Sequence, residues 1–287
     1  MASLKYILIY GPAAVFLALF ALIPVGDVIS HSIATSGSAW QYFAESMTGQ
    51  YLNAFETTFW LSFLSGFLGM AWGGIATYAL LRINHSAITT GISALSSVLA
   101  NFAGLALAVA FMITFGASGL VTNALLTIFH LNLQNMGFNL ASFGGLLLVY
   151  AAFQTPLAMI LLMPAFSSVA GELEQAAYTL GANHFGYLRR VFLPIVFPSL
   201  LGTFALLFAN SFSAYVTAYA LASGSINLVP IQIGFLLNGD VTLNIGLGNA
   251  LAVEEIVVLG VSLWVFALTL KLQRRRGKRS KGTAANA

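Results

Sequence analysis

The segment between residues 171 and 190 is polar, yet it separates two apolar runs that are long enough to cross a membrane. Its apolar positions recur at i, i+3, i+4 and i+7, at Leu173, Ala176, Ala177 and Leu180. This spacing predicts a short helix with one small apolar face. Glu172 and Glu174 stand near its N-terminus, where the helix dipole favours negative charge, and Gly181 ends it. A polar element in this place needs a surface to dock against, so binding is the chemistry that it predicts.

The chain after Gly181 is expected to turn back toward the membrane. Residues 184–190 are long enough for a second helical turn, and Pro194 marks where the next membrane helix begins. The whole segment therefore reads as a helical loop inserted between two membrane helices.

Residues 175–194 read QAAYTLGANHFGYLRRVFLP and resemble the signature loop of the membrane subunits of ABC importers. The consensus of that loop is Glu-Ala-Ala, three residues, Gly, nine residues and then Ile-x-Leu-Pro. The matching positions here are Ala176, Ala177, Gly181, Val191, Leu193 and Pro194. Gln175 replaces the consensus glutamate, which weakens one charged contact with the ATPase subunit, and Glu174 beside it is a candidate to supply that contact. The alternative is an ordinary amphipathic loop helix.

The resemblance implies a set of residues that couple the chain to an ATPase subunit. They are Glu172, Leu173, Glu174, Gln175, Ala176, Ala177, Leu180, Gly181 and Ala182.

The rest of the chain must hold this segment in a membrane. It is 59% hydrophobic and 7% charged with a mean hydropathy of +0.90, more apolar surface than a soluble domain could bury. Spans of about 20 apolar residues are predicted at 6–25, 55–81, 88–115, 140–163, 193–222 and 250–270. The fold class is thus all-α and integral to the membrane, with six transmembrane helices and the coupling loop between the fourth and fifth.

Lys and Arg residues set the orientation, because cytoplasmic loops are rich in both. With the N-terminus inside, Lys5, Arg82, Arg189, Arg190 and the tail from Lys271 all fall in the cytoplasm. The segments 26–54, 116–139 and 223–249 carry no basic residue. We expect a multi-pass protein of the bacterial cytoplasmic membrane with both termini inside.

The predicted organisation has three parts. Residues 1–50 hold the first helix and an outer loop, residues 51–271 form the permease core, and residues 272–287 are a basic, disordered cytoplasmic tail. In the outer segments, 120–131 is expected to be a short surface helix. The stretch 228–248 is interrupted by Gly and Pro, and it is expected to be irregular and to dip into the bundle.

Several kinds of chemistry are excluded. The chain has no cysteine, so no thiolate site exists, and its four histidines fall in four different loops, so no metal site follows. It lacks the Gly-x-x-x-x-Gly-Lys-Ser/Thr loop that cradles a nucleotide and the Gly-x-Ser-x-Gly nucleophile elbow. The chain is therefore not expected to be an enzyme or to bind a cofactor, and ATP and Mg²⁺ belong to a separate ATPase subunit.

Polar residues also interrupt the predicted spans, where an unpaired polar group costs free energy. They are Asn101, Gln154, Asn210, Ser211, Ser213 and Tyr215. Each of them either makes hydrogen bonds between helices or lines a hydrophilic translocation path.

Glu254 and Glu255 lie about one turn inside the outer end of the sixth span, with no Lys or Arg on that side. One interpretation places both in wet interfacial surroundings or against a partner subunit. The other joins one of them with Asp240, as part of the translocation path, in a negative outer vestibule that admits a cationic cargo.

Gly69 and Gly73 form a small-xxx-small pattern in the second span, which allows a neighbouring helix to approach closely. Packing within the chain is favoured here over a dimer contact.

Over residues 50–270 the chain resembles the type I ABC importer permeases, and the stretches MPAF and NLVPIQIG look like the branch for spermidine and putrescine import. The resemblance implies alternating access, with the loop 171–190 moving as a lever. It implies as partners an ABC ATPase dimer, a second permease subunit that is homologous or identical, a solute-binding protein and membrane lipid, but no nucleic acid. Phosphonate, iron or sulfate are alternative cargoes. An ion-coupled secondary transporter and a membrane scaffold are the alternative classes.

Overall fold

The computed structural model describes residues 11–13, 15–34, 40–83, 86–131, 133–238 and 243–285, which form helices and turns without a strand. Six helices within these ranges are long and apolar enough to cross a membrane. They are Gly11–Ile33, Gly49–Arg82, Leu105–Phe129, Phe143–Ser167, His184–Phe212 and Ile245–Lys271. The all-α fold with six candidate spans is confirmed. Residues 6–10 of the first predicted span lie outside the described residues.

The chain divides into two compact units. The first unit combines Met1–Glu56 with Asn227–Val257, and the second combines Thr57–Ile226 with Val258–Ala287. Two long helices, α4 (Gly49–Arg82) and α14 (Ile245–Ala285), contribute residues to both units.

The first unit also contains three shorter helices and one π-helical turn. They are η1 (Ala18–Leu22), α2 (Ile23–Ala34), α3 (Gln41–Ser46) and α13 (Val229–Asn238). Its small core joins Leu236 of α13 to Leu247 and Leu251 of α14, with Tyr42 packed against them. The expectation of an irregular stretch over 228–248 is wrong for α13. Pro230 stands in the first turn of that helix, where a missing N–H breaks no helical hydrogen bond.

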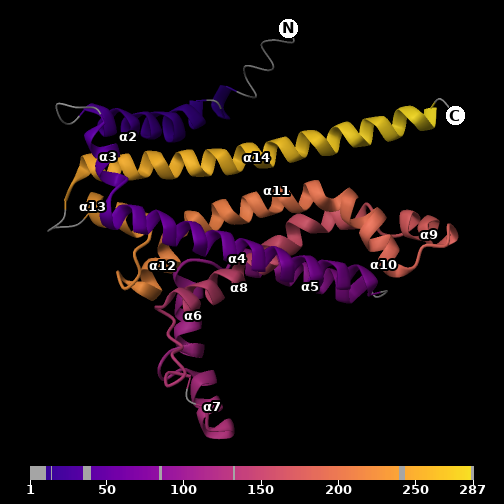
Figure 1. Cartoon of the computed structure of the whole chain (residues 1–287), viewed down its shortest axis with the longest axis horizontal. Coiled ribbons are helices and arrows are strands. Elements are labelled where there is room, and N and C mark those ends of the chain that lie inside the picture. The colour runs from indigo at the N-terminus through magenta and orange to yellow at the C-terminus, as the bar shows by residue number, and fades with distance from the viewer. Residues whose placement is uncertain are drawn as a thin grey trace. The chain divides into compact units, whose positions relative to one another are not determined.

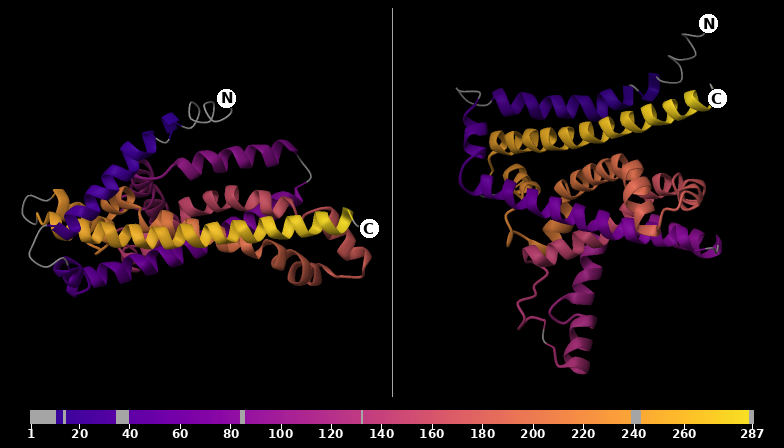
Figure 2. Two further views of the ribbon diagram at one scale, coloured as in Figure 1. Left: turned by 90° about the horizontal axis from the view of Figure 1, so that it is seen from above. Right: turned by 45° about the vertical axis from the view of Figure 1, so that its right-hand side comes forward.

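The second unit holds the remaining elements. They are α5 (Ser86–Asn101), α6 (Leu105–Phe115), α7 (Leu120–Phe129), α8 (Phe143–Ser167), α9 (Glu172–Thr179), α10 (His184–Tyr187), η2 (Leu188–Phe192), α11 (Leu193–Phe212) and α12 (Tyr215–Ala222). Helix α8 is the centre of this unit, because α5 and α11 both pack on it. Figures 1 and 2 show α6 and α7 projecting together from the region of α8.

Two predicted spans are broken in the structure. The third, expected over 88–115, stops at Asn101, and α6 begins only after Gly104, whose φ is +72°. The third candidate span therefore runs from Leu105 through α7, the helix expected at the outer surface. The fifth stops at Phe212, and the chain turns before α12. A run of apolar residues marks membrane depth but does not show where the helix is interrupted.

The C-terminal tail differs from the prediction of disorder. Helix α14 continues without interruption through the basic segment to Ala285 (Figure 1). Lys, Arg and Ala have high helix propensity, so the helix of the last span can continue into the tail.

The glycines of the second span bring α4 against α8. A Cβ added at Gly69 would lie 2.4 Å from Gln154 Cβ, and one at Gly73 would lie 2.5 Å from Ala158 Cβ. Thr77, one turn further, donates a hydrogen bond to the carbonyl of Gly73 at 2.7 Å within its own helix. The small residues therefore serve packing within the chain, as predicted.

Candidate functional site

The predicted coupling helix is present as α9, and a glycine with positive φ stands at each end. Gly171 precedes the helix with φ +95°, and Gly181 follows it with φ +82°. Such backbone conformations are strained for residues that carry a Cβ. Asn183 then caps α10 by accepting a hydrogen bond from the backbone N–H of Gly186 at 2.7 Å. The helix, its end at Gly181 and the second turn after it all agree with the sequence prediction.

The predicted apolar face of α9 is divided between two surroundings. Ala177 is only 7% exposed and packs in a core cluster with Phe166, Tyr187 and Phe192 of the same chain. Leu173 and Ala176, by contrast, are exposed. Because its side chain is covered by its own subunit, Ala177 anchors α9 in the chain, and a contact of this residue with an ATPase subunit stays a prediction.

Glu174 also faces its own chain. Its Oε1 atom accepts a hydrogen bond from Arg82 Nη2 at 2.6 Å, and the two side chains are 13% and 43% exposed. Arg82 is the last residue of α4, so the ion pair joins the end of the second span to the coupling helix. A charged contact of Glu174 with an ATPase subunit stays a prediction, and in this chain its carboxylate is already paired with Arg82. The side chain of Glu172 lies outside what the structure describes.

Three side chains with rings surround this ion pair. Tyr178 donates to Glu174 Oε1 at 2.8 Å, and its hydroxyl lies 3.0 Å from Nδ1 of His184. The His184 Nε2 atom lies 3.4 Å from the hydroxyl of Tyr78, whose ring centroid is 5.0 Å from the Arg82 guanidinium. The hydrogen bond to the Glu174 carboxylate raises the pKa of Tyr178. We call Arg82, Tyr78, Glu174, Tyr178 and His184 the interface network.

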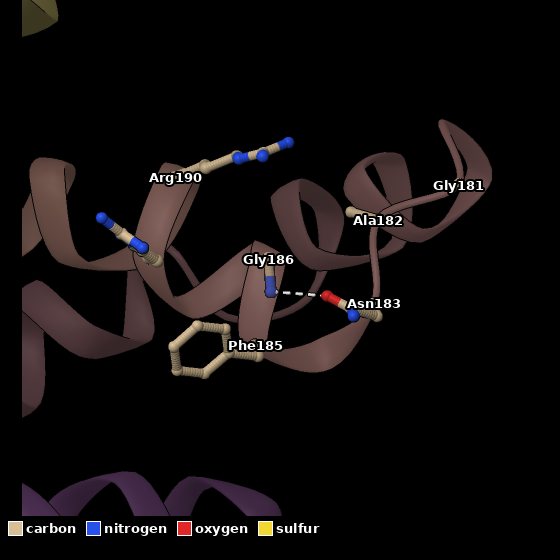
Figure 3. A pocket seen from close by; sticks show the side chains of 7 residues that line it. Gly181, Ala182, Asn183, Phe185, Gly186 and Arg190 are labelled. Carbon is tan, nitrogen blue, oxygen red and sulfur yellow. Dashed lines mark hydrogen bonds between the residues drawn. The ribbon is translucent and has the colours of Figure 1, made fainter.

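Beside α9 a hollow of about 680 Å³ opens along the following turn (Figure 3). It is lined by Gly181, Ala182, Asn183, Phe185, Gly186, Arg189 and Arg190. Leu180 is 88% exposed and Phe185 is 69% exposed. Large apolar side chains this open at the end of a membrane helix indicate a contact with another molecule. Phe185 was not predicted as a contact residue, although its position one turn after Gly181 could have indicated it.

Within the spans, Gln154 is the centre of a buried polar cluster. Its Nε2 atom donates to the carbonyl of Leu207 at 2.6 Å and to Ser211 Oγ at 2.5 Å, both on α11. Ser211 Oγ also lies 2.8 Å from Ser65 Oγ on α4. Gln154 and Ser211 are both buried. Of the two interpretations open for these residues, the structure favours hydrogen bonding between helices, so neither lines a path within this chain. We call Gln154, Ser211 and Ser65 the membrane node.

Four of the predicted path residues are exposed on the second unit, namely Asn101, Asn210, Ser213 and Tyr215. Asn210 is oriented by the membrane node, because its Nδ2 atom donates to Gln154 Oε1 at 3.3 Å. Tyr215 is 37% exposed and stacks on Tyr219 with ring centroids 5.4 Å apart. Polar groups in a span avoid lipid, so these exposed groups indicate water or a partner subunit beside them.

The two breaks in the spans are joined to one another. The backbone N–H of Gly104 donates to Thr217 Oγ1 at 3.0 Å. The Thr217 hydroxyl in turn donates to the carbonyl of Gly104 at 3.3 Å. The Tyr150 hydroxyl donates to the carbonyl of Ala214 at 2.8 Å. Irregular backbone at membrane depth needs such partners. Thr217 and Tyr150 do not stand out in the sequence, because neither residue type is unusual in a membrane helix.

The carboxylates of the sixth span belong to the first unit. Ser46 of α3 donates to Glu254 Oε1 at 2.5 Å, so the partner of this carboxylate is a hydroxyl. Glu255 is partly buried at the next position of α14. Asp240 lies outside the described residues, and the predicted grouping of these three carboxylates is therefore not described.

No protein-family model matches the chain. It is 28% identical over 213 residues to the putative ferric transport system permease protein FbpB 1 of Haemophilus influenzae. The matched region is 72% of this chain and 31% of that protein. The chain thus spans less than a third of the length of this relative. It is 23% identical over 238 residues to the spermidine/putrescine transport system permease protein PotC of Haemophilus influenzae, covering 83% of each.

A solved structure has the same fold. The bacterial alginate ABC transporter in complex with an alginate pentasaccharide-bound periplasmic protein superposes with a TM-score of 0.70 at 16% identity, over 94% of this chain and 96% of that one. In fold the chain is thus similar to the membrane subunit of an ABC transporter, and in sequence it is similar at low identity to permease proteins such as FbpB 1 and PotC, with no branch singled out.

Proposed function

We propose that the chain is the transmembrane permease subunit of an ATP-driven importer, in which ATP hydrolysis takes place in a separate ATPase subunit. A solute-binding protein delivers the cargo outside, and a second permease subunit, identical or homologous, completes the path. The relatives' names support this proposal, because they are permease proteins of transport systems. Both termini lie in the cytoplasm, in agreement with the distribution of Lys and Arg.

The observation that carries the proposal is the exposed surface around α9. Leu173, Leu180 and Phe185 project from a short helical segment that Ala177 anchors in the core of the chain. A segment that is fixed on one side and apolar on the other can transmit a force from a partner. Full burial of one leucine stabilises such a contact by about 1.5 to 3 kcal/mol. Gln175, Ala176, Gly181 and Ala182 belong to the same proposed docking surface.

For the cargo we propose a cation, with a polyamine such as spermidine or putrescine as the first candidate. Six of the eight acidic residues belong to the two segments of the first unit, in which Lys5 is the only Lys or Arg. With the orientation proposed above, this unit gives the outer side a negative field that concentrates cations. A ferric complex fits the same field, whereas a phosphonate or sulfate cargo does not. Glu254, Glu255 and Asp240 are the proposed sources of the field.

Asn101, Asn210, Ser213 and Tyr215 are the residues that we propose line the path. They are exposed in this subunit, and they carry hydroxyl and amide groups without charge. Such groups can replace water around a passing cargo without holding it tightly. The role of the charged residues would then be to concentrate the cargo, and the role of these residues would be to let it pass.

The docking surface can be tested with a single substitution. The tagged full chain is purified in mild detergent together with its ATPase subunit, and Mg·ATP hydrolysis by the complex is measured. Leu180→Glu should abolish the recovered ATPase activity, because a charge replaces a fully exposed apolar contact. Met136→Glu is the matched control, since Met136 is also exposed and apolar but lies outside the docking surface. Equal ATPase recovery with both variants would contradict the proposed docking surface.

The cargo proposal needs a separate measurement. Cells that express the whole transport system are assayed for uptake of labelled spermidine, with putrescine, sulfate and a phosphonate as competitors. Glu254→Gln and Glu255→Gln should each lower spermidine uptake, most at low concentration, while the complex stays assembled. Competition by sulfate or by a phosphonate, but not by putrescine, would exclude the cationic cargo.

A further inference from the structure

Helix α9 is connected to its neighbours in the chain by glycines in unusual conformations. Gly171 separates it from α8 with φ +95°, and Gly181 separates it from α10 with φ +82°. Neither glycine has a neighbour within 4 Å of the place where a Cβ would stand. The chain therefore changes direction on both sides of α9, and the backbone connects α9 only to its sequence neighbours α8 and α10. A movement of α9 reaches other helices through its side chains.

The side chains of α9 reach a helix that is distant in the sequence. Glu174 and Arg82 are 92 residues apart, and their ion pair at 2.6 Å joins α9 directly to the last residue of α4. The third and fifth predicted spans are interrupted at 102–104 and at Ser213. Helix α4 by contrast is one unbroken helix of 34 residues. A continuous helix moves as a rod, whereas an interrupted one can absorb a displacement at its break.

We infer that the Arg82–Glu174 ion pair makes α9 and α4 move as one body, and that this pair carries the movement of the docking surface to the second span. This inference rests on the proposed function and adds the route of transmission to it. Arg82 and Glu174 are positioning residues, because they act on the path through the helices that they join.

The surroundings of the ion pair hold it in one geometry. Tyr178 donates to the same carboxylate oxygen of Glu174 that Arg82 contacts, and His184 lies between the hydroxyls of Tyr178 and Tyr78. The ring of Tyr78 lies against the Arg82 guanidinium. Each group of the pair therefore has a second neighbour that limits its rotation. A pair with restricted rotamers transmits displacement, whereas two mobile charges would only attract one another.

Because the sequence has no cysteine, two introduced cysteines can be labelled selectively, and the distance between α4 and α9 can be measured. Spin labels are attached at Phe67→Cys on α4 and Thr179→Cys on α9, both exposed positions. Phe67 lies 15 residues before Arg82, which places the first label about 22 Å along the helix from the ion pair. The distance between the labels is measured in the complex of the full chain with its ATPase subunit, first without nucleotide and then with trapped Mg·ATP·vanadate.

With the ion pair intact, we expect the same narrow distance distribution in both nucleotide states. Arg82→Gln and Glu174→Gln should each broaden the distance distribution, or shift it by several ångströms, in one of the two nucleotide states. The exchanged pair Arg82→Glu with Glu174→Arg should restore the narrow distribution. Lys271→Gln, which removes one positive charge at the end of the sixth candidate span, is the matched control and should behave as the unaltered chain does.

ATP hydrolysis by each complex is measured in parallel, and it should stay within about threefold of the unaltered complex, because the docking surface is untouched. A distribution in Arg82→Gln that equals that of the unaltered chain in both states would overturn the inference. So would an exchanged pair that is no narrower than the single variants. If the unaltered chain brings no ATPase activity with it, the proposed function has failed and not the route of transmission.

Discussion

The membrane node and the interface network perform the same structural task with different chemistry. Both join elements that are distant in the sequence through side-chain hydrogen bonds. The node consists of amide and hydroxyl groups, and Gln154 at its centre is completely buried. The network contains a full ion pair, and its Arg82 is 43% exposed.

The difference follows from the cost of burying charge. An ionised group inside the hydrocarbon region costs several kcal/mol, whereas a neutral group needs only hydrogen-bond partners. At the end of a span, water solvates part of a charge, so an ion pair can be kept there at little cost. The node is therefore expected to determine stability and the network to determine movement.

The largest effect is expected beside the node, where α4 and α8 are in backbone contact. Gly73→Val should destabilise the fold by about 3 kcal/mol, because the new side chain must displace α8. Its Cβ would lie 2.7 Å from the carbonyl oxygen of Thr155, which cannot move aside as a flexible side chain could. The measurement is SDS-induced unfolding in mixed micelles. Gly260→Val is the matched control, since no atom lies within 4 Å of that position and stability should be retained.

Removing the centre of the node should have the next largest effect. Gln154→Leu keeps most of the side-chain volume but loses the bonds to Leu207 and Ser211, and we expect a loss of about 1 to 2 kcal/mol in the same unfolding assay. Thr155→Val is the control, because among the described residues the Thr155 hydroxyl bonds the carbonyl of Ala151 in its own helix. If both variants lose the same stability, the node does not have the role assigned to it.

The features that could be predicted are those that depend on residues close together in the sequence. The spans appear as apolar runs, and α9 follows from the spacing of four residues and from Gly181. The direction in which α9 faces could not be predicted. Ala176 and Ala177 differ by one position, yet one is exposed and the other is buried, because the residues that cover Ala177 come from α8, α10 and η2.

The interface network could not be predicted for a related reason. Arg82 was recognised only as one of the cytoplasmic charges, and no pattern in the sequence connects it to Glu174. The same holds for the contact of Gly104 with Thr217, which lie 113 residues apart. Pairings across such separations are decided by how whole helices pack, and a periodic pattern carries no information about the neighbour of a helix.

A third prediction concerns the end of α9. Gly181→Leu should cost about 1 to 2 kcal/mol, since its φ of +82° is strained for a residue with a side chain. Free space surrounds the position, so size alone is not the cause. Gly181→Asn should cost less, because Asn tolerates this conformation better than Leu. Thermal unfolding and recovered ATPase activity measure the two effects. Equal losses for Leu and Asn would show that the conformation of Gly181 is not decisive.

The smallest effect is expected from the network itself, and it is lost at alkaline pH. The hydrogen bond from Tyr178 to the Glu174 carboxylate raises the pKa of the phenol. A raised pKa means that the folded state favours the protonated form. The contribution of this bond is therefore complete below the ordinary tyrosine value of about 10 and is lost as the pH rises through the higher value of the folded state.

Tyr178→Phe should accordingly unfold slightly more easily than the unaltered chain at neutral pH, and the difference should shrink at pH values above the ordinary tyrosine range. Comparison with Glu174→Gln separates this bond from the other tyrosines of the chain. In that background the hydrogen-bonded carboxylate is gone, so adding Tyr178→Phe should change the pH dependence no further. A pH-dependent difference of the same size in both backgrounds would show that Glu174 is not the cause. The interface network would then lack the ordered geometry that distinguishes it from an ordinary surface ion pair.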